Sequence, residues 1–193
     1  NLISPLSDDQ LPPSPQAGES IVIFTQEQNA RWPLIQEPSY VYLDQDAIEQ
    51  VLLRLYGPEG TDVLRRSAIQ SFSFEELNTA LNQRRQQAQP TPTPVADNED
   101  LQNSETRPIP LSTIVLTALN EADWVIFAPT GLNPSREGAS FVLKRFLAEQ
   151  ANILDARLAV LAFGPPYELD STEVSKLDLY YGLFSTGRPF VDV

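Results

Sequence analysis

The chain has 193 residues, with 13 Lys and Arg against 26 Asp and Glu, and its formal net charge is −13. Nucleic acid is bound mainly through Lys and Arg that neutralise phosphates, so this balance excludes a general nucleic-acid binder and argues against an anionic membrane surface as partner. With 41% hydrophobic and 20% charged residues, the composition is that of a folded chain, and its length suits a single domain.

Cysteine, histidine and methionine are all absent. Without Cys and His there is no disulfide, thiolate metal site, Ser-His-Asp triad or usual zinc ligand, and we expect no metal site. Neither a GxGxxG nor a P-loop pattern occurs, so no cofactor is expected. No apolar run approaches the roughly 20 residues of a membrane helix, which predicts no membrane insertion. Because the chain opens Asn1-Leu2-Ile3 without Met, we expect it to be a segment of a larger protein.

The first part of the chain predicts a lead-in, a strand and a helix. Residues 1–19 are polar and proline-rich, and we interpret them as an extended lead-in from a preceding domain. Residues 20–25 are β-branched and aromatic, which favours a strand buried on both faces. Apolar residues at helical spacing from Ile48 to Tyr56 predict an amphipathic helix, with Asp44 or Asp46 as its N-terminal cap.

A helix and an insert follow. An apolar stretch surrounds Ile69, and Ser73 then stands three residues before Glu76, which is the capping-box spacing and predicts a helix over 74–88. Residues 89–110 are rich in Pro and polar residues, with too few apolar groups to offset the cost of ordering them. We interpret them as a flexible insert within one domain, with a domain boundary as the alternative.

The second half alternates apolar runs with amphipathic patterns. Strands that alternate with helices imply right-handed crossovers and a parallel sheet covered on both faces. We therefore predict one α/β domain over 20–193, a three-layer α/β/α sandwich with a mostly parallel sheet of about five or six strands. The predicted elements, in chain order, are a helix from Leu111 to Ala118, a strand over 124–128, a helix from Ala139 to Leu147 and strands over 158–163 and 177–184.

Two loops follow predicted strands and are candidate ligand-contacting segments. In open parallel sheets, ligands bind beyond the carboxyl ends of the strands, near free helix N-termini. The alternative is purely structural, in which Asn133 and Ser135 cap a helix and the glycines supply turns. The candidate residues are Thr130, Asn133, Ser135, Arg136 and Glu137 after the strand over 124–128, and Gly164 and Tyr167 after the strand over 158–163.

Pairs of carboxylates can support glycoside hydrolysis, which needs two acids at a fixed separation. In a chain with 26 acids most are expected to be solvated or to cap helices, and no pair is singled out as catalytic. Tyr180 and Tyr181 are interpreted as packing residues of the last strand. The candidate acids are Glu75, Glu76, those from Asp97 to Asp100, Glu137, Glu168 and Asp170.

Three segments carry a family resemblance. The run Trp124-Val-Ile-Phe-Ala, the run from Arg157 to Leu169 and the run from Leu177 to Val193 together resemble the C-terminal α/β sandwich domain of glycoside hydrolase family 3, closest to its β-N-acetylhexosaminidase branch. Where that family has a strand ending in Gly-Asn-Pro-Tyr, this chain has Gly164-Pro165-Pro166-Tyr167, with Pro in place of Asn.

The resemblance implies an accessory domain of a carbohydrate-hydrolysing parent. The family's Asp nucleophile lies on an N-terminal (β/α)8 barrel, and in this branch a barrel-loop His serves as acid. Neither has a counterpart here, so the resemblance implies no catalytic residue in this chain. It also implies a barrel of the same parent as partner, with carbohydrate bound through that parent. The residues leave the location unknown, and an extracellular or cell-envelope location is suspected. By position, it places the loop from Thr130 to Glu137 near substrate.

Other functions are open at this point. One is a flavodoxin-like module that binds a small ligand at its strand ends and helix N-termini. Another is a stand-alone hydrolase that uses two carboxylates. An accessory domain separated from its barrel should also expose apolar residues on one face.

Overall fold

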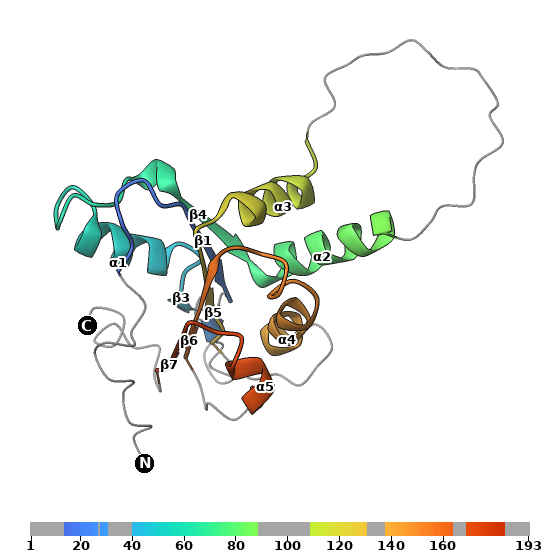
Figure 1. Cartoon of the computed structure of the whole chain (residues 1–193). Helices are drawn as coiled ribbons and strands as arrows, with labels where there is room; N and C mark the ends of the chain where they lie inside the picture. The colour runs from blue at the N-terminus through green and yellow to red at the C-terminus, as the bar shows by residue number, and fades with distance from the viewer. Residues whose placement is uncertain are drawn as a thin grey trace, which may run out of the picture.

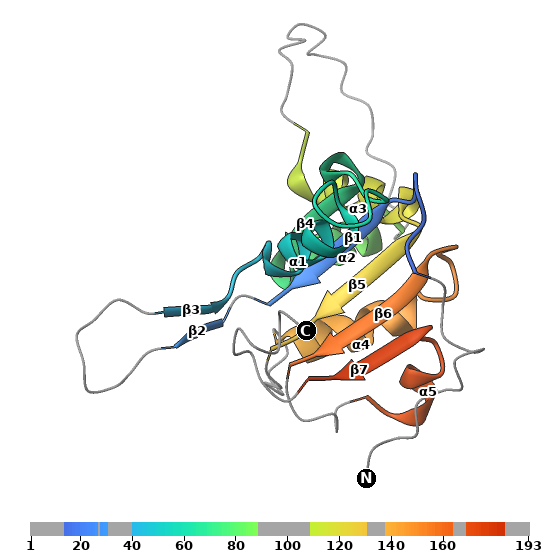
Figure 2. The ribbon, with the colours of Figure 1, turned by 90° about the vertical axis from the view of Figure 1, so that its left-hand side faces the viewer.

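The computed structural model describes residues 14–26, 28–30, 40–88, 109–130, 138–163 and 169–183. They form an α/β fold around a five-stranded, all-parallel sheet in the order β4-β1-β5-β6-β7, shown in Figure 2. Counted along the chain, this is the doubly wound order 2-1-3-4-5. The strands are β1 (Ile21–Thr25), β4 (Ile69–Ser73), β5 (Trp124–Ala128), β6 (Arg157–Ala162) and β7 (Leu179–Gly182).

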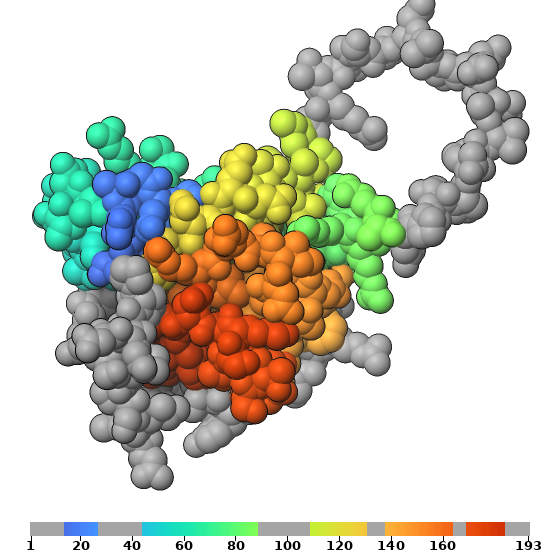
Figure 3. All heavy atoms as spheres, viewed as in Figure 1, coloured from blue at the N-terminus to red at the C-terminus, as the bar shows by residue number. Residues whose placement is uncertain are grey.

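Helices cover both faces of this sheet, so the predicted three-layer sandwich is confirmed. Figure 1 shows α1 on one side of the strands and α2, α3 and α4 on the other. In the view of Figure 3, the side chains of α2, α3 and α4 meet in one continuous surface. The helices are α1 (Ala47–Tyr56), α2 (Phe74–Ala88), α3 (Leu111–Glu121), α4 (Ala139–Glu149) and the short α5 (Ser171–Val174).

The two central strands explain the layering. Every residue of β1 and β5 is buried, as expected for strands covered on both faces. Successive side chains point to opposite faces: Phe24 joins the core beneath α2, α3 and α4, whereas Ile23 joins the core beneath α1. In the larger core, the Phe127 ring centroid lies 5.6 Å from that of Phe24 and 4.8 Å from that of Phe146.

Most predicted elements are confirmed, including β1, α1, α2, α3, β5, α4, β6 and β7. The predicted capping box at the start of α2 is present: the Ser73 backbone N–H donates to Glu76 Oε2 at 2.6 Å, and the Glu76 N–H donates to Ser73 Oγ at 3.2 Å. Residues 14–19 of the lead-in contain no strand or helix. The insert over 89–108 and the lead-in over 1–13 lie outside the described residues.

Besides the short 3-10 helix η2 (Arg66–Ala68), four elements were not predicted. β4 is an edge strand on which Ile69 and Phe72 are buried but Gln70 is exposed, so its apolar signal is weak. A two-stranded antiparallel ribbon of β2 (Gln28–Ala30) and β3 (Tyr40–Leu43) projects beyond the sheet in Figure 2. The single turn of α5 begins at a capping box in which Asp170 accepts the Thr172 and Glu173 backbone N–H groups.

The remaining predictions about surface residues are only partly confirmed. Tyr180 packs against the larger core, but Tyr181 is 48% exposed and is not a packing residue. Exposed large apolar side chains are spread over α1, α3, α4 and β7 rather than gathered on one element, although Ile109, Leu111 and Ile114 form a local group at the start of α3. None of the described helices combines the length and apolarity needed to cross a bilayer.

Candidate functional site

The strand order reverses between β1 and β5, and this point defines the first candidate site. The chain leaves β1 toward β4 on one side, whereas β5 continues toward β6 on the other. The connections that follow two such strands run to opposite sides, and doubly wound folds bind ligands in the crevice outside the carboxyl ends of the strands at this point. Thr25 and Ala128 end the two strands in register, and α1 and α4 lie on opposite faces of the sheet beside them (Figure 1).

Thr130 lies at this edge, as predicted, but its polar groups are used within the fold. The Gln26 backbone N–H donates to the Ala128 carbonyl at 3.2 Å. The Thr130 N–H donates to Gln26 Oε1 at 3.2 Å, and the Thr130 hydroxyl donates to the Gln26 carbonyl at 3.3 Å. Thr130 is 6% exposed. It therefore ties the exits of β1 and β5 together rather than presenting a free hydroxyl.

The other predicted site residues are not described by the structure. Those residues are Asn133, Ser135, Arg136, Glu137, Gly164 and Tyr167. One structural alternative is nevertheless corrected, because the N-cap of α4 is Gly138 and not Asn133 or Ser135. The sequence pattern around Ala139 located the helix but did not identify the residue that precedes it.

Two buried hydroxyls near the strand ends have no hydrogen-bond partner. Thr25 Oγ1 is at the end of β1, in a residue that is fully buried, and Ser140 Oγ is in the first turn of α4, in a residue that is 5% exposed. Thr25 alternates with Phe24 and so points to the α1 face, whereas α4 lies on the opposite face. Leaving a buried hydroxyl unpaired costs free energy, and because Ser140 also lies beside the amide groups of a helix start, Ser140 is the candidate ligand contact.

The N-terminus of α4 lacks the side-chain cap that α2 and α5 have. Gly138 has an extended conformation, φ −71° and ψ 155°, and offers no side chain to the first-turn N–H groups. The first turn also contains no acidic residue. By contrast, Ser73 and Asp170 cap α2 and α5, each with a glutamate three residues on. The unpaired amide groups of a helix start attract negative charge.

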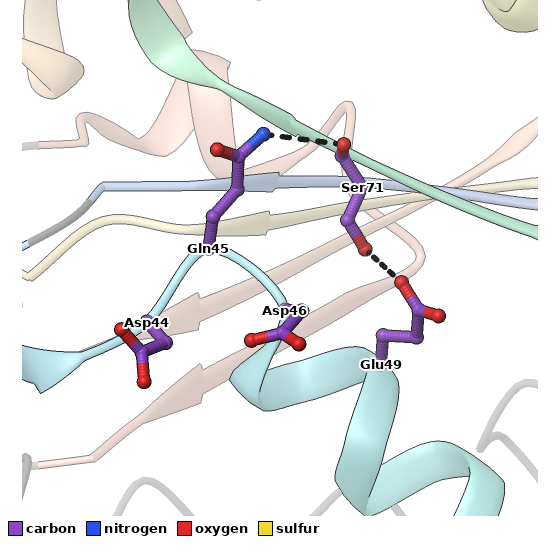
Figure 4. Close-up of a pocket in the computed structure, with 5 residues that line it drawn as sticks. All are labelled: Asp44, Gln45, Asp46, Glu49 and Ser71. Carbon is purple, nitrogen blue, oxygen red and sulfur yellow. Dashed lines mark hydrogen bonds between the residues drawn. The ribbon is translucent and has the colours of Figure 1, made fainter.

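A second candidate site is an open pocket of about 420 Å³ on the α1 face of the sheet. Figure 4 shows its side chains, which come from the turn before α1, from α1 itself and from β4. The turn was considered only as a source of helix caps, so the pocket was missed. Its lining residues are Asp44, Gln45, Asp46, Glu49 and Ser71.

The polar groups of this pocket mainly satisfy one another. Ser71 Oγ donates to Glu49 Oε2 at 2.8 Å, and the Arg66 Nε lies 3.5 Å from Glu49 Oε1. Asp46 is the N-cap of α1 but makes no cap hydrogen bond, and instead accepts one from Gln50 Nε2 at 2.8 Å. Within the described ranges, no three acidic, His or Cys side chains are arranged to hold a metal ion. The pocket is thus polar and acidic.

The candidate acid pairs are not brought together as a catalytic site by the described residues. Glu76 belongs to the capping box of α2, and Asp170 caps α5 with both Thr172 and Glu173 as donors. Both carboxylates therefore have local structural roles. The candidate acids Asp97 to Asp100, Glu137 and Glu168 lie outside the described residues.

No family model matches the chain, and comparison with curated proteins and with solved structures finds no match either. The fold is therefore classed by its own geometry. The chain is an α/β domain with a five-stranded parallel sheet in a doubly wound order and interleaved helices.

Proposed function

We propose that this chain is the C-terminal accessory domain of a β-N-acetylhexosaminidase-like glycoside hydrolase of family 3, and that it does not hydrolyse sugars by itself. One observation carries the proposal. The three segments that resemble the family contain β5, β6 and β7, which are neighbouring parallel strands. These three strands follow one another along the chain and form one continuous side of the sheet, as expected if the segments belong to one domain.

The residue types present support the proposal that this chain does not hydrolyse sugars by itself. The chain has no His and no Cys, so a proton must be moved by carboxylates, Tyr or Lys. The best-placed carboxylate in a pocket, Glu49, accepts a hydrogen bond from Ser71 and faces Arg66. Glu49 therefore links α1 to β4 and to the segment that contains Arg66. Glycoside hydrolysis instead needs two acids with a sugar between them.

The proposed partner is an N-terminal (β/α)8 barrel of the same parent, with carbohydrate bound by that parent. The carboxyl edge of the sheet is the side proposed to approach the sugar, because the loop that contains Arg136 and Glu137 leaves β5 there. At this edge, Thr130 anchors the start of the loop to Gln26. This anchoring would give a substrate-contacting loop a firm base.

The first test reads the gene upstream of Asn1 and assays the purified chain. We expect an upstream barrel with its Asp nucleophile, and no release of chromophore from an aryl N-acetyl-β-glucosaminide by the chain alone. A reading frame without a barrel, or measurable hydrolysis by the chain alone, would refute the accessory-domain proposal.

The second test addresses the loop in the full-length parent. Arg136→Ala and Glu137→Ala should change KM or kcat for the same substrate. Glu59→Ala is a matched control, because Glu59 is an exposed carboxylate in the turn after α1, at the opposite edge of the sheet. If both loop variants keep the kinetics of the control, the loop has no role at the substrate.

A further inference from the structure

We propose that the N-terminus of α4 is a binding site for a small oxyanion of the phosphate type, held by the first-turn backbone N–H groups and the Ser140 hydroxyl. The proposal concerns the carboxyl edge of this chain and does not rest on the accessory-domain function. Its two supports are independent of each other. One is the uncapped start of an 11-residue helix, and the other is a buried hydroxyl without a partner.

The first support is the state of the helix start. Gly138 provides no side-chain cap, and the Val142 N–H donates to the Gly138 carbonyl at 3.2 Å. Among the described residues, none accepts a hydrogen bond from the N–H groups of residues 139–141. These groups converge at the positive end of the helix dipole, which favours an anion with several acceptor oxygens.

The second support is Ser140. Its side chain is enclosed, with only 5% of the residue exposed, and its Oγ makes no hydrogen bond. The Cα–Cβ bond of a helical residue tilts toward the helix N-terminus, so the Ser140 side chain leaves the backbone on the side where the first-turn amide groups lie. A buried hydroxyl is normally paired. A bound oxyanion would accept from this hydroxyl and from the amides together, which satisfies all of these donors at once.

The surrounding charges fit a small anion better than a long polyanion. A net charge of −13 repels nucleic acid at a distance, but first-turn amides act within hydrogen-bond range. Lys144 lies one turn along α4 from Ser140, yet its Nζ is 3.7 Å from Glu173 and is already ion-paired. The attraction at the site therefore comes mainly from the backbone and from Ser140.

The test is a titration of the full chain with inorganic phosphate and, separately, with methyl phosphate, followed by the amide NMR resonances of residues 139–141. Saturable shifts with either probe are expected. Tighter binding of methyl phosphate would identify a phosphate ester as the natural source, and tighter binding of inorganic phosphate would identify the free anion.

Three variants separate a binding role from a structural one. Ser140→Ala should weaken phosphate binding about tenfold, the effect of losing one hydrogen bond to a charged group. Gly138→Asp places a carboxylate on the same amides, so it should abolish phosphate binding while raising the melting temperature as a better N-cap. Thr25→Val is the matched control, because it removes a buried, unpartnered hydroxyl that lies on the α1 face of the sheet, the same face as Ile23.

Either of two results would overturn the proposal. If neither probe shifts the resonances of residues 139–141 in a saturable way, the site does not bind a phosphate group. The same conclusion follows if the Ser140→Ala and Gly138→Asp variants bind phosphate with the same affinity as the Thr25→Val variant.

Discussion

The Arg157 guanidinium lies over the indole ring of Trp124, with its central carbon 5.0 Å from the ring centroid. These two residues begin β6 and β5 and are partners in the parallel register. Glu19 joins them from the lead-in: its Oε2 accepts from Trp124 Nε1 at 2.8 Å, and its Oε1 accepts from Arg157 Nη1 at 3.2 Å. One carboxylate thus fastens the segment before β1 to the two neighbouring strands.

A second carboxylate strengthens the same edge. Asp123 Oδ2 accepts from the Ser20 backbone N–H at 2.7 Å and also from the Ser20 hydroxyl. These two hydrogen bonds hold the pKa of Asp123 below its usual 3.8, although burial acts in the opposite direction. Burial also raises the pKa of Glu19, but hydrogen bonds from the Gln16 N–H and Trp124 and the charge of Arg157 outweigh it and lower that pKa below 4.5.

These pKa shifts predict a loss of stability in acid. A carboxyl group with a lowered pKa in the folded state is less readily protonated there than in the unfolded chain. Its stabilising contribution is therefore complete above the unfolded values of 4.5 and 3.8, and is lost as the pH falls through the lower folded values. Urea unfolding from neutral pH down to below 3.8 should show this decline in the free energy of unfolding.

Variants assign the decline to these groups. Glu19→Gln and Asp123→Asn should each cost about 1 kcal/mol at neutral pH and reduce the dependence on pH. Glu59→Gln, which changes an exposed carboxylate outside this cluster, is the control variant. An undiminished acid decline in the double variant of Glu19 and Asp123 would show that other groups cause it.

Ser71 should matter more to stability than Arg66, although both contact Glu49. Glu49 is 8% exposed, and the Ser71 hydroxyl bonds it at 2.8 Å, so Ser71→Ala removes a hydrogen bond from an enclosed carboxylate and should cost about 1.5 to 3 kcal/mol. The Arg66 side chain is 81% exposed, and Arg66→Ala should cost less than about 1 kcal/mol. Chemical denaturation of the two variants checks this order, and equal losses would contradict it.

Phe127 and Phe141 provide a matched pair for the core. Phe127 is fully buried and packs against Phe24, Phe74 and Phe146, so Phe127→Ala should cost about 3 to 5 kcal/mol through the cavity it leaves. Phe141 is 41% exposed on α4, and Phe141→Ala should change the free energy of unfolding by about 1 kcal/mol or less. Thermal or urea unfolding of both variants measures the difference. A small loss for Phe127→Ala would mean that the core is not organised around these rings.

Local sequence patterns predicted the elements whose signal lies within a few residues. The apolar runs of β1 and β5 identified strands buried on both faces, and the spacing of Ser73 and Glu76 identified the start of α2. These signals work because side-chain periodicity and capping involve neighbours along the chain. The alternation of strands and helices was also enough to predict a parallel, three-layer fold.

The candidate sites depended on partners far apart in the sequence. Thr130 was predicted as a ligand contact, yet its hydroxyl is used by Gln26, 104 residues away. Ser140 was not predicted as a site residue, because no neighbour in the sequence indicates that its hydroxyl is buried without a partner. The pocket on the α1 face arises only where the turn before α1 meets Ser71.

The sequence by itself determined the charge, the absence of Cys and His, and the succession of strands and helices, since these follow from composition and from contacts between near neighbours. Only the tertiary structure decided the order of the strands, the edge position of β4 and which polar groups are satisfied. The physical reason is that strand pairing and burial are set by residues distant along the chain, so a hydroxyl or carboxylate acquires its role only when the fold brings its partner to it or leaves it without one.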